Sequence, residues 1–339
     1  HALTNTHKEE RAEHKARSRV VLQHDDKQRQ EHHASNLDKI LEAVHAKRVV
    51  AHHACHHQRC GNLYKLHRLH SNASYLKPGS HAYTFVAQGT KVFNADEERA
   101  AHYCKKFGLH HHLVDISFDD YKEYTPIVMK TKCAPVHSIE PQIYKAALMA
   151  KADGVQMIVV GESADLIFGG MDQLISKDWL LDDFAKRYTF LDPQLVLENP
   201  ADVSELYERF RQGEHIDFLS FMDNVFSIES SSSYMNAFAT AELPYYDPYA
   251  RLVMRDPLDL HRVRNGEPKY LVRDLYAMKY PEVPIPDKIP MPRPVDMIFK
   301  DWAGPQRKEF RKDIPMDKLT GNQKWQLWCA EQFLNTYDK

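Results

Sequence analysis

The sequence predicts an α/β protein in which a parallel, doubly wound sheet is followed by an all-helical region. Short apolar runs alternate with helical patterns from residue 47 to residue 170, and this alternation is typical of parallel strands joined by crossover helices. The run at 155–160 is almost continuously apolar, as expected of a strand that is covered on both faces. After Gly170 the strand patterns end, and helical periodicity continues to residue 280.

The elements of the α/β region are expected between residues 47 and 182, which we assign to one domain. Strands are predicted at 48–51, 83–87, 112–116 and 155–160, and helices at 94–107 and 139–152. In the first of these helices, Asn94 followed by Glu97 forms a variant of the capping box, which satisfies free N–H groups of the first turn.

Two further regions flank this domain. Residues 1–46 are expected to form an N-terminal extension with a short amphipathic helix, whose apolar residues stand at helical spacing: Leu37, Ile40, Leu41 and Val44. Residues 183–339 are expected to form a helical C-terminal domain. Six prolines within 281–294 exclude the interior of a helix there and predict an ordered loop.

Length, charge and cysteine content narrow the functional class. The chain has 339 residues and a net charge of -2, which gives no electrostatic reason to expect a nucleic-acid partner. Its longest apolar runs fall far short of the roughly 20 residues of a membrane-spanning helix, and no secretory signal pattern opens the sequence. We therefore expect no membrane partner. Five cysteines without a CxxC pair favour a reducing, cytoplasmic setting.

The sharpest local feature is the stretch 160–170, directly after the most strand-like run. In an open parallel sheet, ligands bind beyond the carboxyl ends of the strands. Gly161 would let a ligand approach the backbone, and Glu162 and Asp165 place two carboxylates there that could hold a divalent metal or an amine. On spacing alone, an ordinary loop between a strand and an acidic helix start explains this stretch equally well.

This stretch resembles S-G-E-G-[SA]-D-E-[LV]-F-G-G-Y, the signature of the synthetase domain of asparagine synthetases, a branch of the PP-loop ATP pyrophosphatases. Val160, Ser163, Leu166 and Met171 depart from it, and Ile167 is a mild change from Leu or Val. Seven positions match: Gly161, Glu162, Ala164, Asp165, Phe168, Gly169 and Gly170.

Two later stretches support the resemblance, because they follow in the family's order. Residues 243–247, Leu-Pro-Tyr-Tyr-Asp, are similar to V-P-F-L-D, and residues 265–273 are similar to G-K-x-x-K-x-x-L-R. Lys288 stands where the family carries a lysine in a Pro-rich segment. Together the similar stretches cover about residues 47 to 310.

The resemblance implies a fold of the adenine nucleotide α-hydrolase-like type and an ATP-dependent, AMP-forming amide ligase that uses Mg²⁺. A small-molecule carboxylate would attack the α-phosphorus of ATP, and ammonia or another amine would then displace AMP. By position, Asp165 would bind Mg²⁺ or pyrophosphate, Lys269 would stabilise the charge of the transition state, and Glu162 would contact the substrate or its amine. ATP-binding positions would be Val86, Val160 and Gly161. Without its flanking motif, Lys269 would be taken for a solvated helix lysine.

No cysteine nucleophile stands at the start of the sequence, and the residues before the first strand are too few for a glutaminase domain, so we expect no such domain here. An active enzyme is therefore expected to use free ammonia, a separate glutaminase or other subunit, or an amine on its own substrate.

The family's S-G-G-x-D-S phosphate loop should fall at residues 54–59, where the chain reads Ala-Cys-His-His-Gln-Arg. A loop without glycine cannot easily take positive φ angles or bring its amides to a phosphate. The same part of the chain is rich in histidine, because 14 of the 21 histidines lie in its first 81 residues. As printed, this chain should bind ATP poorly.

Three explanations are open at this point. The first is that the residues given for about 1–82 depart from those of the natural chain. The second is a catalytically dead pseudoenzyme that serves as an interaction subunit, and the third is a zinc-binding segment. The zinc alternative uses helical i, i+4 pairs and nearby thiols: His52 with His56, His53 with His57, Cys55 and Cys60.

Overall fold

The computed structural model describes residues 49–53, 76–86, 94–171, 174–279, 281–282 and 294–337. These residues all belong to the unit that runs from Arg48 to Lys339. The predicted N-terminal extension, the phosphate-loop position at 54–59 and Lys288 lie outside the described residues. Among the described residues, no helix has the length and apolar character that crossing a membrane requires.

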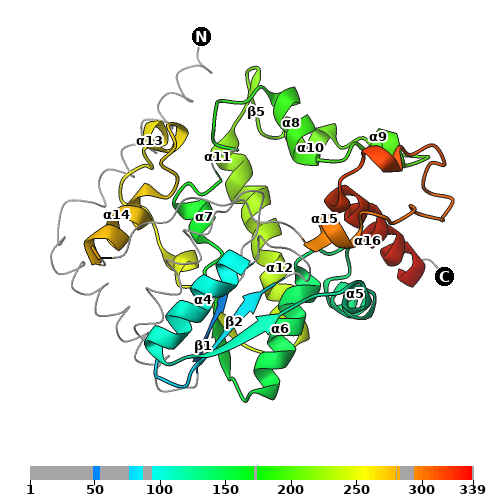
Figure 1. The fold of residues 1–339 in the computed structure, drawn as a ribbon. Helices are drawn as coiled ribbons and strands as arrows, with labels where there is room; N and C mark the ends of the chain where they lie inside the picture. Colours follow the sequence, from blue (N-terminus) through cyan, green and yellow to red (C-terminus); the bar gives the residue numbers. More distant parts are fainter. Residues whose placement is uncertain are drawn as a thin grey trace, which may run out of the picture. The chain divides into compact units, whose positions relative to one another are not determined.

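A five-stranded parallel sheet forms the α/β part of the fold, with the strand order β3-β2-β1-β4-β7 (Figure 1). Its strands are β1 (Val49–His53), β2 (His81–Phe85), β3 (His110–Val114), β4 (Met157–Val159) and β7 (Tyr245–Tyr246). The chain adds β2 and β3 on one side of β1 and then returns to add β4 and β7 on the other side. The parallel α/β sheet is confirmed, and the doubly wound covering of both its faces stays a prediction.

Helices α4 (Asn94–Phe107), α5 (Phe118–Lys132) and α6 (Glu140–Ala152) accompany the sheet. A capping box begins α5, because Ser117 and Asp120 each bond the other's backbone N–H. Small and branched apolar residues at helical spacing form the buried face of α6. Its members Ile143, Ala146, Ala147 and Ala150 have no exposed surface.

The remainder of the described chain is mainly helical. Its elements are α7 (Ala164–Ile167), α8 (Leu181–Thr189), α9 (Pro193–Val196), α10 (Ser204–Glu208), β5 (Arg211–Gln212), β6 (His215–Ile216), α11 (Phe218–Phe221), the π-helical turn η1 (Met222–Phe226), α12 (Ser227–Thr240), the 3-10 turn η2 (Tyr249–Arg251), α13 (Leu260–Arg264), α14 (Tyr270–Lys279), α15 (Pro294–Ile298), the 3-10 turn η3 (Met316–Lys318) and α16 (Gly321–Tyr337).

The elements α11, η1 and α12 follow one another without a break and form one helical rod, which contributes side chains to two different cores. Phe221 and Phe226 belong to an aromatic cluster of the helical region, in which the ring of Phe221 lies 4.9 Å from that of Phe184. Tyr234 and Phe238, further along the same rod, belong to the core beside the sheet.

The predicted helix at 94–107 has the bounds of α4, while the strands predicted at 83–87 and 112–116 each lie two residues too late. An apolar alternation fixes the period of a strand but not its ends, which depend on the neighbouring strands. The strand predicted at 155–160 is the shorter β4.

The prediction of an all-helical second region is wrong, because β5 and β6 form an antiparallel pair and β7 joins the parallel sheet. The N–H of Ile158 donates to the Pro244 carbonyl at 3.0 Å, and the N–H of Val160 donates to that of Tyr246 at 2.8 Å. Two residues are too few to show a strand period in sequence. The domain boundary at 182 stays a prediction, although β7 lies beyond it.

The structure also bears on the zinc alternative. His52 and His53 are the last residues of strand β1, whereas the i, i+4 pairs with His56 and His57 require one helix. The helical pairing is therefore wrong at these two positions, while His56 and His57 lie outside the described residues.

A buried carboxylate joins three helices beside the sheet. Glu140 of α6 has no exposed surface, and its Oε1 accepts from Lys132 Nζ of α5 at 2.5 Å and from the His137 N–H at 2.8 Å. Its Oε2 accepts from Asn236 Nδ2 of α12 at 2.8 Å. Since a charge without water needs partners, this network ties the three helices together.

Replacing Lys132 with methionine should lower the free energy of unfolding by about 3 kcal/mol, because the buried Glu140 carboxylate loses its cation. Urea denaturation at pH 7 measures the change. The exposed Lys130 of the same helix is the matched control, and its change to methionine should alter stability by less than about 0.5 kcal/mol. Equal losses in the two variants would contradict this account.

Burial should also control thiol reactivity. Desolvation raises the pKa of Cys104 to about 11 and that of Cys329 to about 12, so few thiolates form at these positions at pH 8. Cys133 is exposed. Maleimide labelling followed by peptide mass mapping should therefore modify Cys133 much faster than the other two, and urea should abolish the difference. Equally fast labelling in the folded protein would count against the burial described here.

Candidate active site

The predicted ATP-binding residues lie at the carboxyl edge of the sheet, directly after the two strands that flank β1. Val86 follows β2, and its N–H donates to the Val114 carbonyl at 3.0 Å. Val160 and Gly161 follow β4. Because all strands of this sheet are parallel, these residues lie on either side of the carboxyl end of β1, where the strand order reverses.

A carboxylate directly after β7 holds the loop that follows β4. Asp247 Oδ2 accepts from the Ser163 N–H at 2.8 Å, and Asp247 Oδ1 accepts from the Tyr249 N–H at 3.0 Å. Ser163 precedes α7 but does not cap it with its own side chain. Asp247 was not among the predicted site residues, although it ends the 243–247 motif, and that motif was the signal that could have identified it.

Lys269 and Asp165 meet in a buried ion pair between Nζ and Oδ1. Each residue is only 7% exposed. The two predicted site residues are therefore brought together from α7 and from the residue before α14. Their roles toward ATP and Mg²⁺ stay predictions.

The backbone of Lys269 is held in an unusual conformation. Its φ is +58°, in the left-handed region that costs a residue with a side chain about 1 kcal/mol or more. Its carbonyl nevertheless accepts from the N–H groups of Val272 and Arg273, both at 3.0 Å, in the first turn of α14. Such strain persists only where the surrounding structure fixes it, and it is concentrated at functional sites.

The two glycines of the motif are each required by their surroundings. A Cβ on Gly170 would overlap Asp165 Oδ1 and Lys269 Cε. Gly169 has a φ of +70°, and a Cβ there would lie 2.7 Å from Leu258 Cδ2. The pair of Lys269 and Asp165 therefore explains Gly170, while the left-handed φ and the contact with Leu258 explain Gly169.

Glu162 adds a third acidic group at this edge. Burial raises the pKa of Tyr245, and the negative charges of Asp247 and Glu162 raise it further, so these groups lie within electrostatic reach of one another. Carboxylate oxygens are the ligands that Mg²⁺ prefers, and it takes one or two of them beside phosphate oxygens. Asp165 and Glu162 fit that donor set, with Asp165 bound to Lys269 in this structure.

Comparison with known families covers most of this site. The sequence model of the family described as asparagine synthase matches residues 66–301, a span that contains Val86, the 160–170 loop, Asp247 and Lys269. No curated protein matches the chain.

The ion pair can be tested by a double-mutant cycle. Lys269→Met and Asp165→Asn should each lower the free energy of unfolding by about 3 kcal/mol, because each leaves a buried group without its partner. The double variant should lose about 2 kcal/mol less than the sum of the two.

The exposed pair of Lys122 and Asp119 is the control, and its coupling should stay below about 0.5 kcal/mol. Urea denaturation measures all the variants. Additive losses at Lys269 and Asp165 would show that the two residues do not act as a pair.

Proposed function

Because the chain belongs to the asparagine synthase family, we propose that it is an ATP-dependent carbon–nitrogen ligase that releases AMP and pyrophosphate. A carboxylate oxygen of the substrate attacks the α-phosphorus, and the bond to the β-phosphate breaks to release pyrophosphate. The nitrogen of ammonia or an amine then attacks the acyl carbon, and AMP leaves. The observation that carries the proposal is the buried pair of Lys269 and Asp165 beside Glu162 at the carboxyl edge of the sheet.

The pair supports this chemistry because its two halves have complementary ligands in a metal-bound nucleotide. Lys269 Nζ is a compact cation suited to phosphate oxygens, and Asp165 is suited to a divalent metal. When bound, Mg²⁺ would neutralise the pyrophosphate. When the nucleotide binds, Lys269 would leave Asp165 for a phosphate oxygen, and Asp165 would bind the metal instead. Neither buried charge is then left without a partner, so the cost of desolvation stays low.

The strain at Lys269 is consistent with a positioning role. Its left-handed backbone and the absence of a side chain at Gly170 direct the ammonium to one place. An ammonium fixed in advance, away from water, stabilises charge that develops in a transition state more than a mobile one does. Glu162, near Asp247, would face the acceptor or its amine, while Val86, Val160 and Gly161 would face the nucleotide.

A second function has one observation in its favour. Residues 54–59 as printed carry neither glycine nor aspartate, which favours a pseudoenzyme that binds a partner protein instead of ATP. A peptide mass map across residues 47–65 establishes the residues of the loop at 54–59 before any assay.

A separate glutaminase as nitrogen donor and the cytoplasmic setting stay predictions.

Pyrophosphate–ATP exchange tests the proposed reaction. With a panel of amino acids and other carboxylic acids, the wild-type protein should show exchange with at least one. Lys269→Ala should lower the rate by about 100-fold or more, as expected when a group that stabilises transition-state charge is lost. Lys269→Arg should also fail, because the larger guanidinium does not fit beside Gly170.

The exposed Lys186 of α8 is the matched control, and its change to alanine should leave exchange unchanged. If the wild-type protein exchanges with no acid and binds no ATP in calorimetry, the ligase proposal is wrong. A stable partner on purification would then support the pseudoenzyme.

A further inference from the structure

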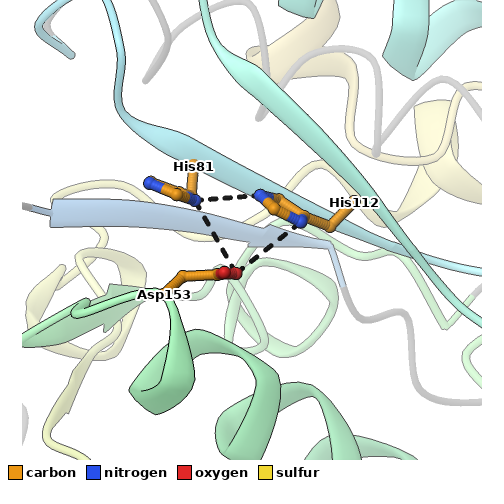
Figure 2. Close-up of side chains that lie close together, drawn as sticks. All are labelled: His81, His112 and Asp153. Atoms are coloured by element: carbon orange, nitrogen blue, oxygen red, sulfur yellow. Dashed lines mark hydrogen bonds and ion pairs between the residues drawn. The ribbon is translucent and has the colours of Figure 1, made fainter.

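A second group of chemically active side chains lies away from the candidate active site. His81 begins β2, His112 lies in β3, and Asp153 follows the last residue of α6. Figure 2 shows the three side chains converging beside β2. Among the described residues, this is the cluster of histidine, cysteine and carboxylate groups with the spacing of a metal site.

Sheet register brings the two histidines together. Tyr83 pairs with His112 across β2 and β3, and side chains two residues apart share a face of a strand, so His81, Tyr83 and His112 lie on one face. The rings of His81 and His112 lie 5.0 Å apart with planes within 12°. His81 Nδ1 and His112 Nε2 are 2.9 Å apart.

Asp153 completes the group from α6. Its Oδ2 lies 3.8 Å from His81 Nδ1 and 3.6 Å from His112 Nδ1. The Tyr83 hydroxyl donates to the same Oδ2 at 2.6 Å, which fixes the orientation of the carboxylate, as groups behind metal ligands commonly do.

We propose that His81, His112 and Asp153 bind a divalent transition-metal ion of the Zn²⁺ type. Two imidazole nitrogens and a carboxylate oxygen form a donor set that this ion favours. Bonds of about 2.0 Å in tetrahedral geometry place ligand atoms about 3.3 Å apart. His81 Nδ1 and His112 Nδ1 lie 3.8 and 3.6 Å from Asp153 Oδ2, close to this spacing. One donor atom from each of the three residues lies within 4.8 Å of the other two.

Accessibility also suits a metal. The side chains of His81, His112 and Asp153 are 22%, 25% and 31% exposed, so an ion can enter and water can fill the fourth position. The site would join two strands and a helix. His81 stands at the amino end of β2, whereas the active-site residues follow carboxyl ends, so the ion would stabilise the fold and take no part in ligation.

The test compares zinc binding by four variants after removal of metal with a chelator. His81→Ala, His112→Ala and Asp153→Asn should each lose the same one equivalent of tightly bound Zn²⁺, with affinity reduced at least about 100-fold. His111→Ala is the matched control. His111 is the neighbour of His112 on β3, its ring bonds Thr84, and its loss should leave that equivalent in place.

Equilibrium dialysis with elemental analysis counts the ions, and the comparison with His111→Ala corrects for weak binding by histidines elsewhere in the chain. Zn²⁺ should also raise the Tm of the wild-type protein by several degrees and that of Asp153→Asn much less. Co²⁺ should give the wild-type protein the visible absorption of a four-coordinate ion.

Asp153→Asn keeps the shape of the side chain and an acceptor for Tyr83, so it decides the test if a histidine variant fails to fold. The proposal is overturned if the wild-type protein holds no tight zinc, or if Asp153→Asn binds as much as His111→Ala. It does not rest on the proposed ligase, since pyrophosphate exchange should survive in Asp153→Asn.

Discussion

An ammonium and a carboxylate that are both removed from water have to satisfy each other at the carboxyl edge of the sheet. Lys269 and Asp165 come from different parts of the chain, and the structure around them allows the two side chains to meet. Gly170 leaves the space that the aliphatic part of the Lys269 side chain occupies. The backbone of Lys269 itself has a left-handed φ. Because a buried charge without a partner is so costly, these local departures from ordinary geometry are tolerated together.

The contact between Lys269 and Asp165 joins the α/β region to the helical region, so the candidate site needs both. The sheet supplies the loop after β4, while the helical region supplies Lys269 and also β7, and Asp247 directly after β7 holds that loop. A site assembled in this way exists only once the last strand has paired with β4. The strand order therefore matters for chemistry as well as for stability, because it brings loops from both sides of β1 to one edge.

Much of this arrangement could be predicted from sequence, and the limits have physical causes. The α4 helix was predicted to the residue because its period and ends are local, whereas β7 is only two residues long and exists through its bonds to β4. The motifs identified Asp165 and Lys269, yet nothing in a sequence reports a φ angle or a pairing. The cluster of His81, His112 and Asp153 likewise depends on the register between strands, which no single segment encodes.

The π-helical turn η1 has a consequence for how the chain can vary. The helical rod from α11 to α12 packs in the aromatic cluster before and within the turn, and in the sheet core after it. Each residue of a helix advances the side-chain direction by about 100°, so deleting one residue within η1 would rotate Tyr234 and Phe238 away from the sheet. Natural relatives should therefore tolerate many substitutions along this rod but keep its length, and insertions should gather in the loops that flank it.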